Sequence, residues 1–296
     1  MNTSAHLKIG IIGIGLIGSS LAQALKKVDQ DRQIVICDQS VDHLEIARDM
    51  DLGTAYTTRL SDIGQKCDLI FLCIPVRSMG DVVKDLAPYL KPGAIITDVG
   101  SVKSYVIRTV EHHIPADCHF IPGHPVAGLE TSGPDKGYAE LFENRSYVLT
   151  PSAKTDKIAI KTVRDVLSPI GVHISELDPE SHDKILGFTS HFPHIIAFSA
   201  MLESEKISQT LDIDVSEFNG GSYEDMTRVA TADMAMWRDI FLTNSDNLEN
   251  VLQDIKARMD FFIELAKNKD VKELEDLVEK ARELKIMQNA KKKRRA

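Results

Sequence analysis

The stretch Ile9-Gly-Ile-Ile-Gly-Ile-Gly-Leu-Ile-Gly18 decides the fold, because a short apolar run leads directly into three glycines spaced as G-x-G-x-x-G. The apolar run predicts a buried strand, residues 19–27 predict a helix, and the apolar run 34–37 predicts a second strand. In such a unit the first glycine allows a tight turn, the second lets the backbone approach a pyrophosphate, and the third lets the helix pack closely on the strand. A phosphate would then lie on the amides of the helix N-terminus. We therefore predict a bound dinucleotide rather than a glycine turn that serves packing alone.

An acidic residue at the end of the second predicted strand indicates which dinucleotide binds. Asp38 follows Gly18 by 20 residues, where a carboxylate can accept both ribose hydroxyls of NAD and would repel the 2′-phosphate of NADP. The predicted cofactor is therefore NAD. The residues expected to contact it lie in the glycine turn and directly after strands: Gly13, Gly15, Leu16, Ile17, Gly18, Asp38, Pro75, Val76 and Ser101.

The rest of the first half alternates apolar runs with amphipathic stretches. Predicted strands cover residues 68–74, 94–99, 118–121, 146–150 and 172–174, and predicted helices cover 41–50, 81–90 and 154–167. This alternation indicates an α/β fold, a Rossmann-type doubly wound parallel sheet with right-handed crossovers. Ligands of such sheets bind beyond the carboxyl ends of the strands. We expect one crevice to be lined by three segments that leave strand ends, Pro75–Ser78, Gly100–Lys103 and Pro122–Gly128.

The second half lacks a convincing strand pattern and reads as helical. Helices are predicted over residues 180–203, 223–241, 245–268 and 271–289, with a break at Asn219-Gly220-Gly221. We predict two domains, a dinucleotide-binding domain over 1–178 and an all-helical substrate and dimerisation domain over 179–296. The broad apolar faces of these helices suggest that the second domain completes its core by pairing with a second copy.

Composition narrows the class of protein. The 296 residues carry a formal net charge of −9, which argues against a general nucleic-acid binder because phosphate contacts need a clustered positive surface. The basic tail Lys291–Arg295 is expected to be a solvated chain end rather than an RNA or membrane patch. The four cysteines form no C-x-x-C pair and read as buried thiols of a reducing compartment. Since no run approaches the roughly 20 apolar residues needed to span a bilayer, we expect a cytoplasmic protein without a membrane partner.

Two residues at predicted strand ends could carry the chemistry. A nicotinamide enzyme must manage the proton that accompanies hydride transfer, and an imidazole suits this because its pKa lies near neutrality. His124 follows a predicted strand, in a loop fixed by prolines and glycines, although a loop histidine can also simply bind backbone. Ser101, at another strand end, could orient a substrate hydroxyl or the histidine. It could equally cap the helix that begins near Lys103.

The stretch 182–194 is more polar than a core helix should be. His191 and His194 are three residues apart, but no third ligand or carboxylate at matching spacing is apparent, so we predict no metal site. Core histidines and an anion or substrate site both remain open readings. Arg228 could bind a carboxylate bidentately, although an exposed helical arginine is the default for such a position.

Taken together, five motifs in order resemble the prephenate dehydrogenase family, which includes arogenate and cyclohexadienyl dehydrogenases. They are Gly13–Gly18, Asp98-Val-Gly-Ser-Val-Lys103, Gly123-His-Pro-Val-Ala-Gly128, Ser190-His-Phe-Pro-His194 and Met236-Trp-Arg-Asp239. The resemblance implies a homodimer with an active site between a Rossmann-type and a helical domain. It also implies the reaction, in which NAD⁺ takes hydride from the carbon bearing the 4-hydroxyl of prephenate, CO₂ leaves, and 4-hydroxyphenylpyruvate, a precursor of tyrosine, results.

The resemblance assigns roles to individual residues. His124 is similar to the histidine that accepts the proton of the 4-hydroxyl, and Ser101 to the serine that orients both groups. The substrate-binding residues that it implies comprise two carboxylate binders, a gate pair at the pocket mouth, two acidic positions and two further residues of the second-domain motif. In that order they are His194 and Arg228, Glu130 and Trp237, Asp183 and Asp225, and Ser190 and His191.

Other readings remain. A β-hydroxyacid dehydrogenase would need a glycine-rich helix start before a catalytic lysine, and Lys184 lacks those glycines. A non-catalytic dinucleotide sensor need not carry His124 and Ser101 at strand ends. Prephenate and L-arogenate are not distinguished, because Leu129 stands where a polar, discriminating residue would be sought. Because the sequence ends soon after its last predicted helix, we expect no fused regulatory domain, and we expect any inhibition by tyrosine to act at the active site or the dimer interface.

Overall fold

The computed structural model describes residues 7–129 and 131–293, and Glu130 therefore lies outside the described residues. The chain separates into two compact units, Met1–Ser245 and Asp246–Ala296. The first unit contains the sheet and all the remaining predicted site residues. The predicted domain boundary at residue 178 marks the change from strands to helices. The separation after Ser245 is a different division of the chain and does not test it, so the boundary stays a prediction.

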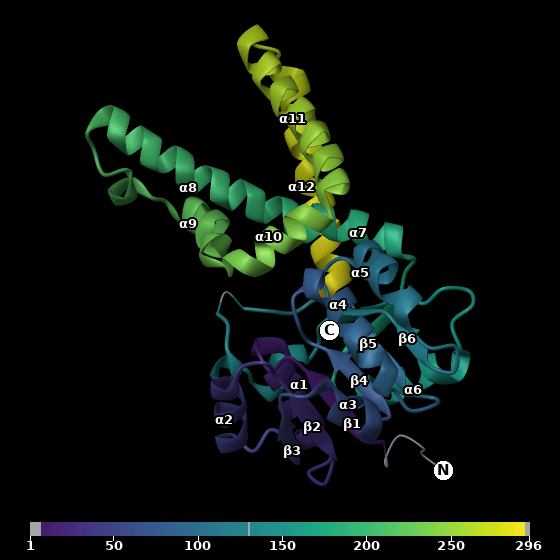
Figure 1. Cartoon of the computed structure of the whole chain (residues 1–296). Coiled ribbons are helices and arrows are strands. Elements are labelled where there is room, and N and C mark those ends of the chain that lie inside the picture. The colour runs from purple at the N-terminus through teal and green to yellow at the C-terminus, as the bar shows by residue number, and fades with distance from the viewer. Residues whose placement is uncertain (1–6, 130, 294–296) are drawn as a thin grey trace. The chain divides into compact units, whose positions relative to one another are not determined.

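The first unit is built on a six-stranded parallel sheet, as the alternating pattern predicts (Figure 1). Its strands are, in spatial order, β3 (Ala55–Thr57), β2 (Ile34–Cys37), β1 (Ile9–Ile12), β4 (Leu69–Leu72), β5 (Ile95–Asp98) and β6 (His119–Ile121). All residues of β1, β2, β4 and β5 are buried, which explains their almost continuous apolar sequence.

Helices cover both faces of this sheet. Side chains of α1 (Leu16–Val28), α2 (Val41–Asp49) and α6 (Lys157–Leu167) share one apolar cluster with Ile9, Ile11 and Phe71. Side chains of α3 (Leu60–Lys66), α4 (Met79–Leu86) and α5 (Lys103–Val110) share the other with Ile12 and Ile70. Successive strand residues thus face opposite layers, and the doubly wound Rossmann-type fold is confirmed.

A second, three-stranded sheet was not foreseen in full. Its strands are β7 (Gly123–Pro125), β8 (Ser146–Leu149) and β9 (His173–Glu176), with β7 antiparallel and β9 parallel to β8. His124 therefore lies on a strand, directly opposite Val148, and the predicted loop is wrong. Two prolines and two glycines within seven residues look like a turn, because the pairing with a strand over 20 residues later leaves no local signal.

A long helix follows the second sheet. Asp178 accepts a hydrogen bond from the amide of Ser181 and so caps α7 (Pro179–Leu186), which continues through a π-helical turn at Gly187–His191 into α8 (Phe192–Leu211). The predicted helix 180–203 is thus confirmed in type, but it ends eight residues later. A π turn shifts the side chains that follow it, and such turns occur frequently at functional sites.

The predicted single helix 223–241 is instead three short elements, α9 (Gly221–Thr227), a 3₁₀ turn at Arg228–Thr231 and α10 (Met234–Thr243). The break lies at Asp233, whose side chain accepts the amide of Met236 at 2.7 Å. Aspartate competes well for such a capping position, and this local hydrogen bond overrides the apolar periodicity that favoured one helix.

The helix Pro179–Leu211 also has the length and hydropathy of a membrane-spanning segment, contrary to the reading of the sequence. Core helices of globular proteins meet the same criterion, so the finding is weak evidence for a membrane. Only 22% of its most apolar window is buried. Large side chains such as Leu202 and Leu211 therefore remain exposed along α8.

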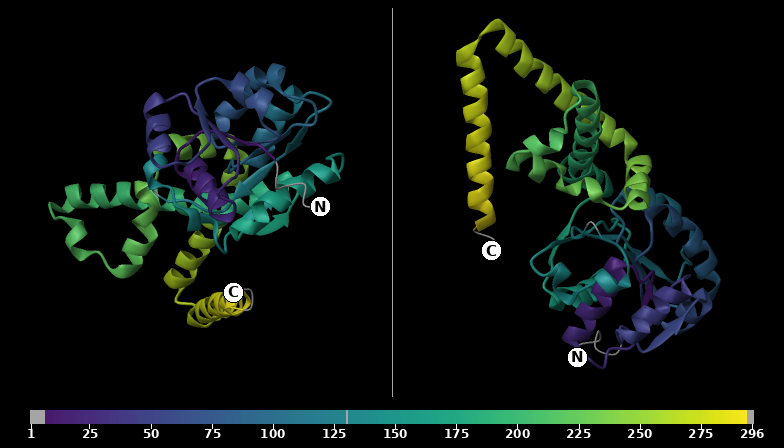
Figure 2. Two further views of the ribbon diagram at one scale, coloured as in Figure 1. Left: turned by 90° about the horizontal axis from the view of Figure 1, so that it is seen from below. Right: turned by 90° about the vertical axis from the view of Figure 1, so that its left-hand side faces the viewer.

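The second unit holds α12 (Val271–Lys293) and, apart from its first residue, α11 (Ser245–Asn268) (Figure 2). Both helices lie close to their predicted bounds. Lys269 adopts a positive φ of 55° at the turn that joins them. Apolar side chains are exposed on both helices, among them Phe261 and Ile263 on α11 and Leu284 and Ile286 on α12.

Candidate active site

The glycine turn has the shape needed to receive a pyrophosphate. Gly13 adopts a φ of +91°, and a Cβ atom on Gly18 would lie 2.1 Å from the carbonyl oxygen of Gly13, so neither position tolerates a side chain. A Cβ atom on Gly15 would meet nothing within 4 Å. The backbone of Gly15, at the start of α1, therefore faces open space where a phosphate can approach the helix amides.

Asp38 is held in place at the end of β2. One carboxylate oxygen accepts the amide of Ile14 and the other accepts the amide of Ser40, both at 2.8 Å. Charge is thereby fixed beside the glycine turn, at the position where a ribose would bind. Leu16 is buried at the start of α1, and Val76 is buried in a 3₁₀ turn after β4 that Pro75 precedes. The residues of this edge fit NAD.

A buried ion pair joins the ends of β5 and β7. The ammonium group of Lys103 contacts the Asp98 carboxylate and donates to the carbonyl oxygen of Gly123 at 2.7 Å, and both charged side chains are fully buried. Asp98 in turn accepts the amides of Gly100 and Gly123, at 2.8 and 3.1 Å. The pair therefore fixes the backbone on both sides of Ser101 and directly before His124.

His124 begins a chain of buried hydrogen bonds. Its Nδ1 lies 2.8 Å from Nε2 of His182, and Nδ1 of His182 lies 2.8 Å from a carboxylate oxygen of Asp183. His182 and Asp183 belong to α7, and their side chains are almost completely buried. Within the described residues, no protein group makes a hydrogen bond to Nε2 of His124.

Asp183 also caps the helix that follows Ser101. Its two carboxylate oxygens accept the backbone amides of Lys103 and Ser104, at 2.7 and 2.8 Å. The N-cap residue of α5 is Val102, whose side chain makes no capping hydrogen bond. The alternative reading of Ser101 as a helix cap is therefore wrong. Asp183 and its neighbour His182 together tie the Ser101 segment to the His124 strand.

Burial sets the charge states of this cluster. Burial lowers the pKa of His124 well below its usual value, and the neighbouring His182, Lys103 and His191 lower it further. Burial raises the pKa of Asp183, but hydrogen bonds from His182 and from the Ser104 and Lys103 amides outweigh this, and the net shift is downward. At neutral pH a neutral His124 thus lies at the end of a chain that begins at an ionised carboxylate.

A second cluster, continuous with the first, gathers the other predicted aromatic residues. The side-chain amide nitrogen of Asn244 donates to the carbonyl oxygen of Asp183 and lies 3.0 Å from Nδ1 of His191. His191 is buried, which lowers its pKa to about 4, and its ring meets the edge of Trp237. The ring of His194 stacks on Trp237 with centroids 3.5 Å apart and donates through Nδ1 to the carbonyl oxygen of Ser190.

The remaining predicted substrate residues lie on neighbouring elements. Arg228 begins the 3₁₀ turn that packs against α8, and Asp225 lies on α9, where both are exposed. Glu130 lies outside the described residues. Contacts that run through His182 and Asn244 therefore link His124, Asp183, His191, Trp237 and His194 into one cluster.

Reasoning from sequence missed four buried polar residues of this site: Asp98, Lys103, His182 and Asn244. Asp98 and Lys103 are the first and last residues of the motif Asp98-Val-Gly-Ser-Val-Lys103. Their opposite charges, close to a predicted strand end, were the available signal for an ion pair. His182 adjoins Asp183, but nothing in the sequence indicates that its ring reaches His124. No group of three or more His, Cys, Asp or Glu side chains suited to a metal occurs in residues 7–129 and 131–293.

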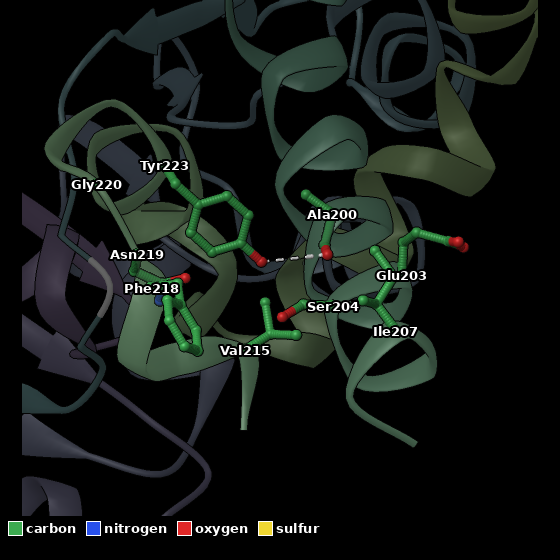
Figure 3. Close-up of a pocket in the computed structure, with 9 residues that line it drawn as sticks. All are labelled: Ala200, Glu203, Ser204, Ile207, Val215, Phe218, Asn219, Gly220 and Tyr223. Carbon is green, nitrogen blue, oxygen red and sulfur yellow. Dashed lines mark hydrogen bonds between the residues drawn. The ribbon is translucent and has the colours of Figure 1, made fainter. Parts of the chain in front are cut away.

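A separate pocket of about 380 Å³ lies between α8 and α9 (Figure 3). Apolar side chains such as Ile207, Val215 and Phe218 line it, and the hydroxyl of Tyr223 crosses it to the carbonyl oxygen of Ala200 at 3.3 Å. None of its lining residues belongs to the predicted site, so this pocket is not the candidate active site.

Comparison with known proteins agrees with this geometry. The model of the prephenate dehydrogenase nucleotide-binding domain matches residues 21–176, and that of the prephenate dehydrogenase dimerization domain matches residues 178–280. A cyclohexadienyl dehydrogenase of Zymomonas mobilis is 41% identical over 252 residues, which cover 84% of this chain and 85% of that protein.

Solved structures give the same result. The prephenate dehydrogenase of Aquifex aeolicus, in complex with hydroxyphenyl propionate and NAD⁺, matches with a TM-score of 0.88 and 32% identity, covering 96% of this chain and 98% of that one. The arogenate dehydrogenase of Synechocystis matches with a TM-score of 0.80 and 29% identity, covering 95% and 99%. The chain is thus an NAD-dependent oxidoreductase that belongs to the prephenate dehydrogenase family.

Proposed function

We propose that the chain catalyses the NAD-dependent oxidative decarboxylation of prephenate to 4-hydroxyphenylpyruvate in tyrosine biosynthesis. The observation that carries this proposal is the neutral, buried His124 at the carboxyl end of the sheet, which is hydrogen-bonded to His182 through Nδ1 and, among the described residues, has no protein partner at Nε2. The edge of the sheet that fits NAD lies on the same side, since cofactor and base both follow the carboxyl ends of parallel strands.

His124 acts in this proposal as general base. Bound NAD⁺ supplies the hydride acceptor for C4 of the substrate. Nε2 of His124 takes the proton of the 4-hydroxyl group, and Ser101 orients this hydroxyl. The C–C bond to the ring carboxylate then breaks with release of CO₂, the ring becomes aromatic, and the proton returns to the same oxygen. Aromatisation makes the step strongly favourable, so the protein mainly has to position the reactants.

Substrate recognition is assigned to donors from the helical segments. Prephenate carries two carboxylates, and His194 and Arg228 are the proposed binders, with Ser190, His191 and Asp225 beside them. Loss of one charge-assisted hydrogen bond should weaken substrate binding by about 1.5–3 kcal/mol, roughly ten- to a hundredfold. Trp237 and Glu130 are proposed as the gate of the pocket. For Asp183 a substrate contact is the less favoured role, since both its oxygens already accept hydrogen bonds.

A second substrate, L-arogenate, is favoured by a specific observation. It differs from prephenate by an amino group in place of the side-chain keto group, and the relative from Zymomonas mobilis is named for the wider cyclohexadienyl class. Leu129, exposed after β7, offers no charge that would select the amine. We therefore propose activity on prephenate with accompanying activity on L-arogenate.

A homodimer in the cytoplasm is the proposed working form. Apolar side chains are exposed on α8 and, in the other unit, on α11 and α12, and the dimerization-domain model matches residues 178–280. Each of these faces is one that a second copy could cover. Sedimentation of the purified protein at micromolar concentration should give a single species of twice the chain mass. A monomer would contradict this part of the proposal.

The activity is tested by following NADH at 340 nm with prephenate and L-arogenate in parallel. The expected result is turnover with prephenate, slower turnover with L-arogenate, and little reduction of NADP⁺. The His124→Asn variant should lose about 10²–10⁴-fold in kcat while still binding NAD⁺. A matched His173→Asn variant, at an exposed position of β9, should keep the wild-type rate.

A further inference from the structure

We propose that His182 and Asp183 are positioning residues that hold His124 in the tautomer whose proton is on Nδ1, so that the lone pair on Nε2 is available to the substrate. The proposal rests on the function proposed for His124 and adds two residues to which that function assigns no catalytic part. Its evidence is the unbroken chain from the Asp183 carboxylate through both rings of His182 and His124.

The positions of the protons follow from the ends of this chain. An ionised carboxylate can only accept, so the Nδ1 of His182 that lies 2.8 Å from Asp183 must carry a proton. When the ring of His182 is neutral, as the proposal requires, its Nε2 bears the lone pair and accepts the Nδ1–H of His124 at 2.8 Å. His124 is neutral as well, so its own Nε2 carries no proton.

The carboxylate at the start of the chain is held ionised by its surroundings. Asp183 accepts two backbone amides as well as His182, and these bonds favour its charged form. The other charged groups near the rings, Lys103 and Asp98, neutralise each other in their own ion pair. His191 is a further titratable neighbour, and its pKa of about 4 keeps it neutral at the pH of the assay.

One added proton would reverse the arrangement. If His182 became an imidazolium, both its nitrogens would donate, and His124 would have to accept at Nδ1 and carry its proton on Nε2. The base would then have no lone pair for the substrate. A neutral His182 is thus required for function, and replacing it by a ring without nitrogen frees His124 to adopt the other tautomer.

The same arrangement stabilises the product of proton transfer. Once Nε2 of His124 has taken the substrate proton, the imidazolium still donates through Nδ1 to His182, which Asp183 polarises. A carboxylate that orients a catalytic imidazole through a hydrogen bond acts in this way without itself being protonated. Here a second imidazole lies between the carboxylate and the base.

The direct test is nitrogen NMR of the full-length protein labelled with ¹⁵N in the histidine rings, at pH 8. The signals of His124 are identified from the spectrum of His124→Asn. We expect Nδ1 of His124 to be protonated and Nε2 to be unprotonated, with His182 in the same tautomer. A proton on Nε2 of His124 in the wild-type protein would overturn the proposal.

Two variants extend the test. His182→Phe keeps the ring shape but removes the acceptor, so a proton should appear on Nε2 of His124, and kcat should fall by roughly ten- to a thousandfold with the KM for NAD⁺ unchanged. His182→Gln, whose amide oxygen can still accept, should restore part of kcat. Equal activity of the two variants and the wild type would contradict the positioning role.

His173→Phe is the control variant: this site is exposed, so the change should affect neither the His124 signals nor kcat. If neither cyclohexadienyl substrate turns over while the wild-type spectrum shows the expected tautomer, the proposed function fails and the positioning role stands. If turnover is normal but Nε2 of His124 is protonated, only the positioning role fails. The wild-type spectrum gives this answer even if a variant does not fold.

Discussion

The ammonium group of Lys103 lies 2.7 Å from the carbonyl oxygen of Gly123, the residue that precedes His124. Lys103 begins α5, two residues after Ser101, while Gly123 begins β7, so one buried cation joins the two segments that carry the proposed chemistry. Asp98 compensates the charge and binds the amides of Gly100 and Gly123. This relationship predicts that the pair governs both stability and catalysis.

Replacing Lys103 by methionine should therefore be severe. It leaves the Asp98 carboxylate buried without its partner, which should cost about 3–5 kcal/mol in the free energy of unfolding measured with urea. Any folded fraction should show reduced kcat. The matched control is Lys136→Met, which breaks an exposed pair with Asp135 and should cost less than about 1 kcal/mol. A Lys103→Met protein as stable as the control would show that the pair contributes nothing.

Stability should fall as the solution is acidified below pH 6.5. Burial lowers the pKa of His191 to about 4 and that of His124 well below its usual value. In mildly acidic solution these two side chains therefore bind protons in the unfolded chain but not in the folded chain. Their stabilising contribution is complete above about pH 6.5 and is lost as the pH falls through the folded pKa values. His191 alone should remove about 2 kcal/mol between pH 7.5 and 5.0.

The comparison of urea unfolding at these two pH values in wild type and His191→Phe measures this term. The variant should lose less stability on acidification than the wild type. An identical loss in both proteins would mean that His191 is protonated in the folded state at pH 5.0.

Asp38 is predicted to control cofactor choice. Asp38→Arg should weaken NAD⁺ binding and relieve the exclusion of NADP⁺, because the repulsion of the 2′-phosphate is replaced by attraction. Asp38 also accepts the amides of Ile14 and Ser40, so Asp38→Asn, which removes charge but keeps an oxygen, separates electrostatic from structural effects. The ratio of kcat/KM for the two cofactors is the measurement, and an unchanged ratio in Asp38→Arg would make the residue purely structural.

The single tryptophan should report on the substrate pocket. Trp237 stacks on His194 with ring centroids 3.5 Å apart, so its fluorescence should respond when His194 engages a carboxylate. Titration with 4-hydroxyphenylpyruvate should change the emission in wild type but much less in His194→Asn. An unaltered titration in that variant would remove His194 from the proposed binding site.

Local signals in the sequence determined most of the fold, and the features they missed depend on distant contacts. The buried strands and glycine turn could be predicted because apolar runs and G-x-G-x-x-G act locally. The strand at Gly123–Pro125 could not, because its partner is β8. The break at Asp233 could not either, since a capping bond there competes with an apolar pattern that continues on both sides.

The candidate site divides in the same way. His124 and Ser101 could be proposed because parallel strands deliver their carboxyl ends to one edge. His182 could not, because its role depends on α7 packing against α5 so that Asp183 reaches the amides of Lys103 and Ser104. Its identity as a neighbour of Asp183 is visible in the sequence, but its 2.8 Å contact with His124 is a property of the folded chain.

The most direct test of the central claim is the stoichiometry of the reaction with prephenate. NADH is measured by absorbance, CO₂ by trapping from carboxyl-labelled prephenate, and 4-hydroxyphenylpyruvate by chromatography, all on the same sample. Oxidative decarboxylation predicts equal amounts of the three products, all lost together in His124→Asn. NADH without CO₂, or no NADH from either prephenate or L-arogenate in a protein that binds NAD⁺, would contradict the account.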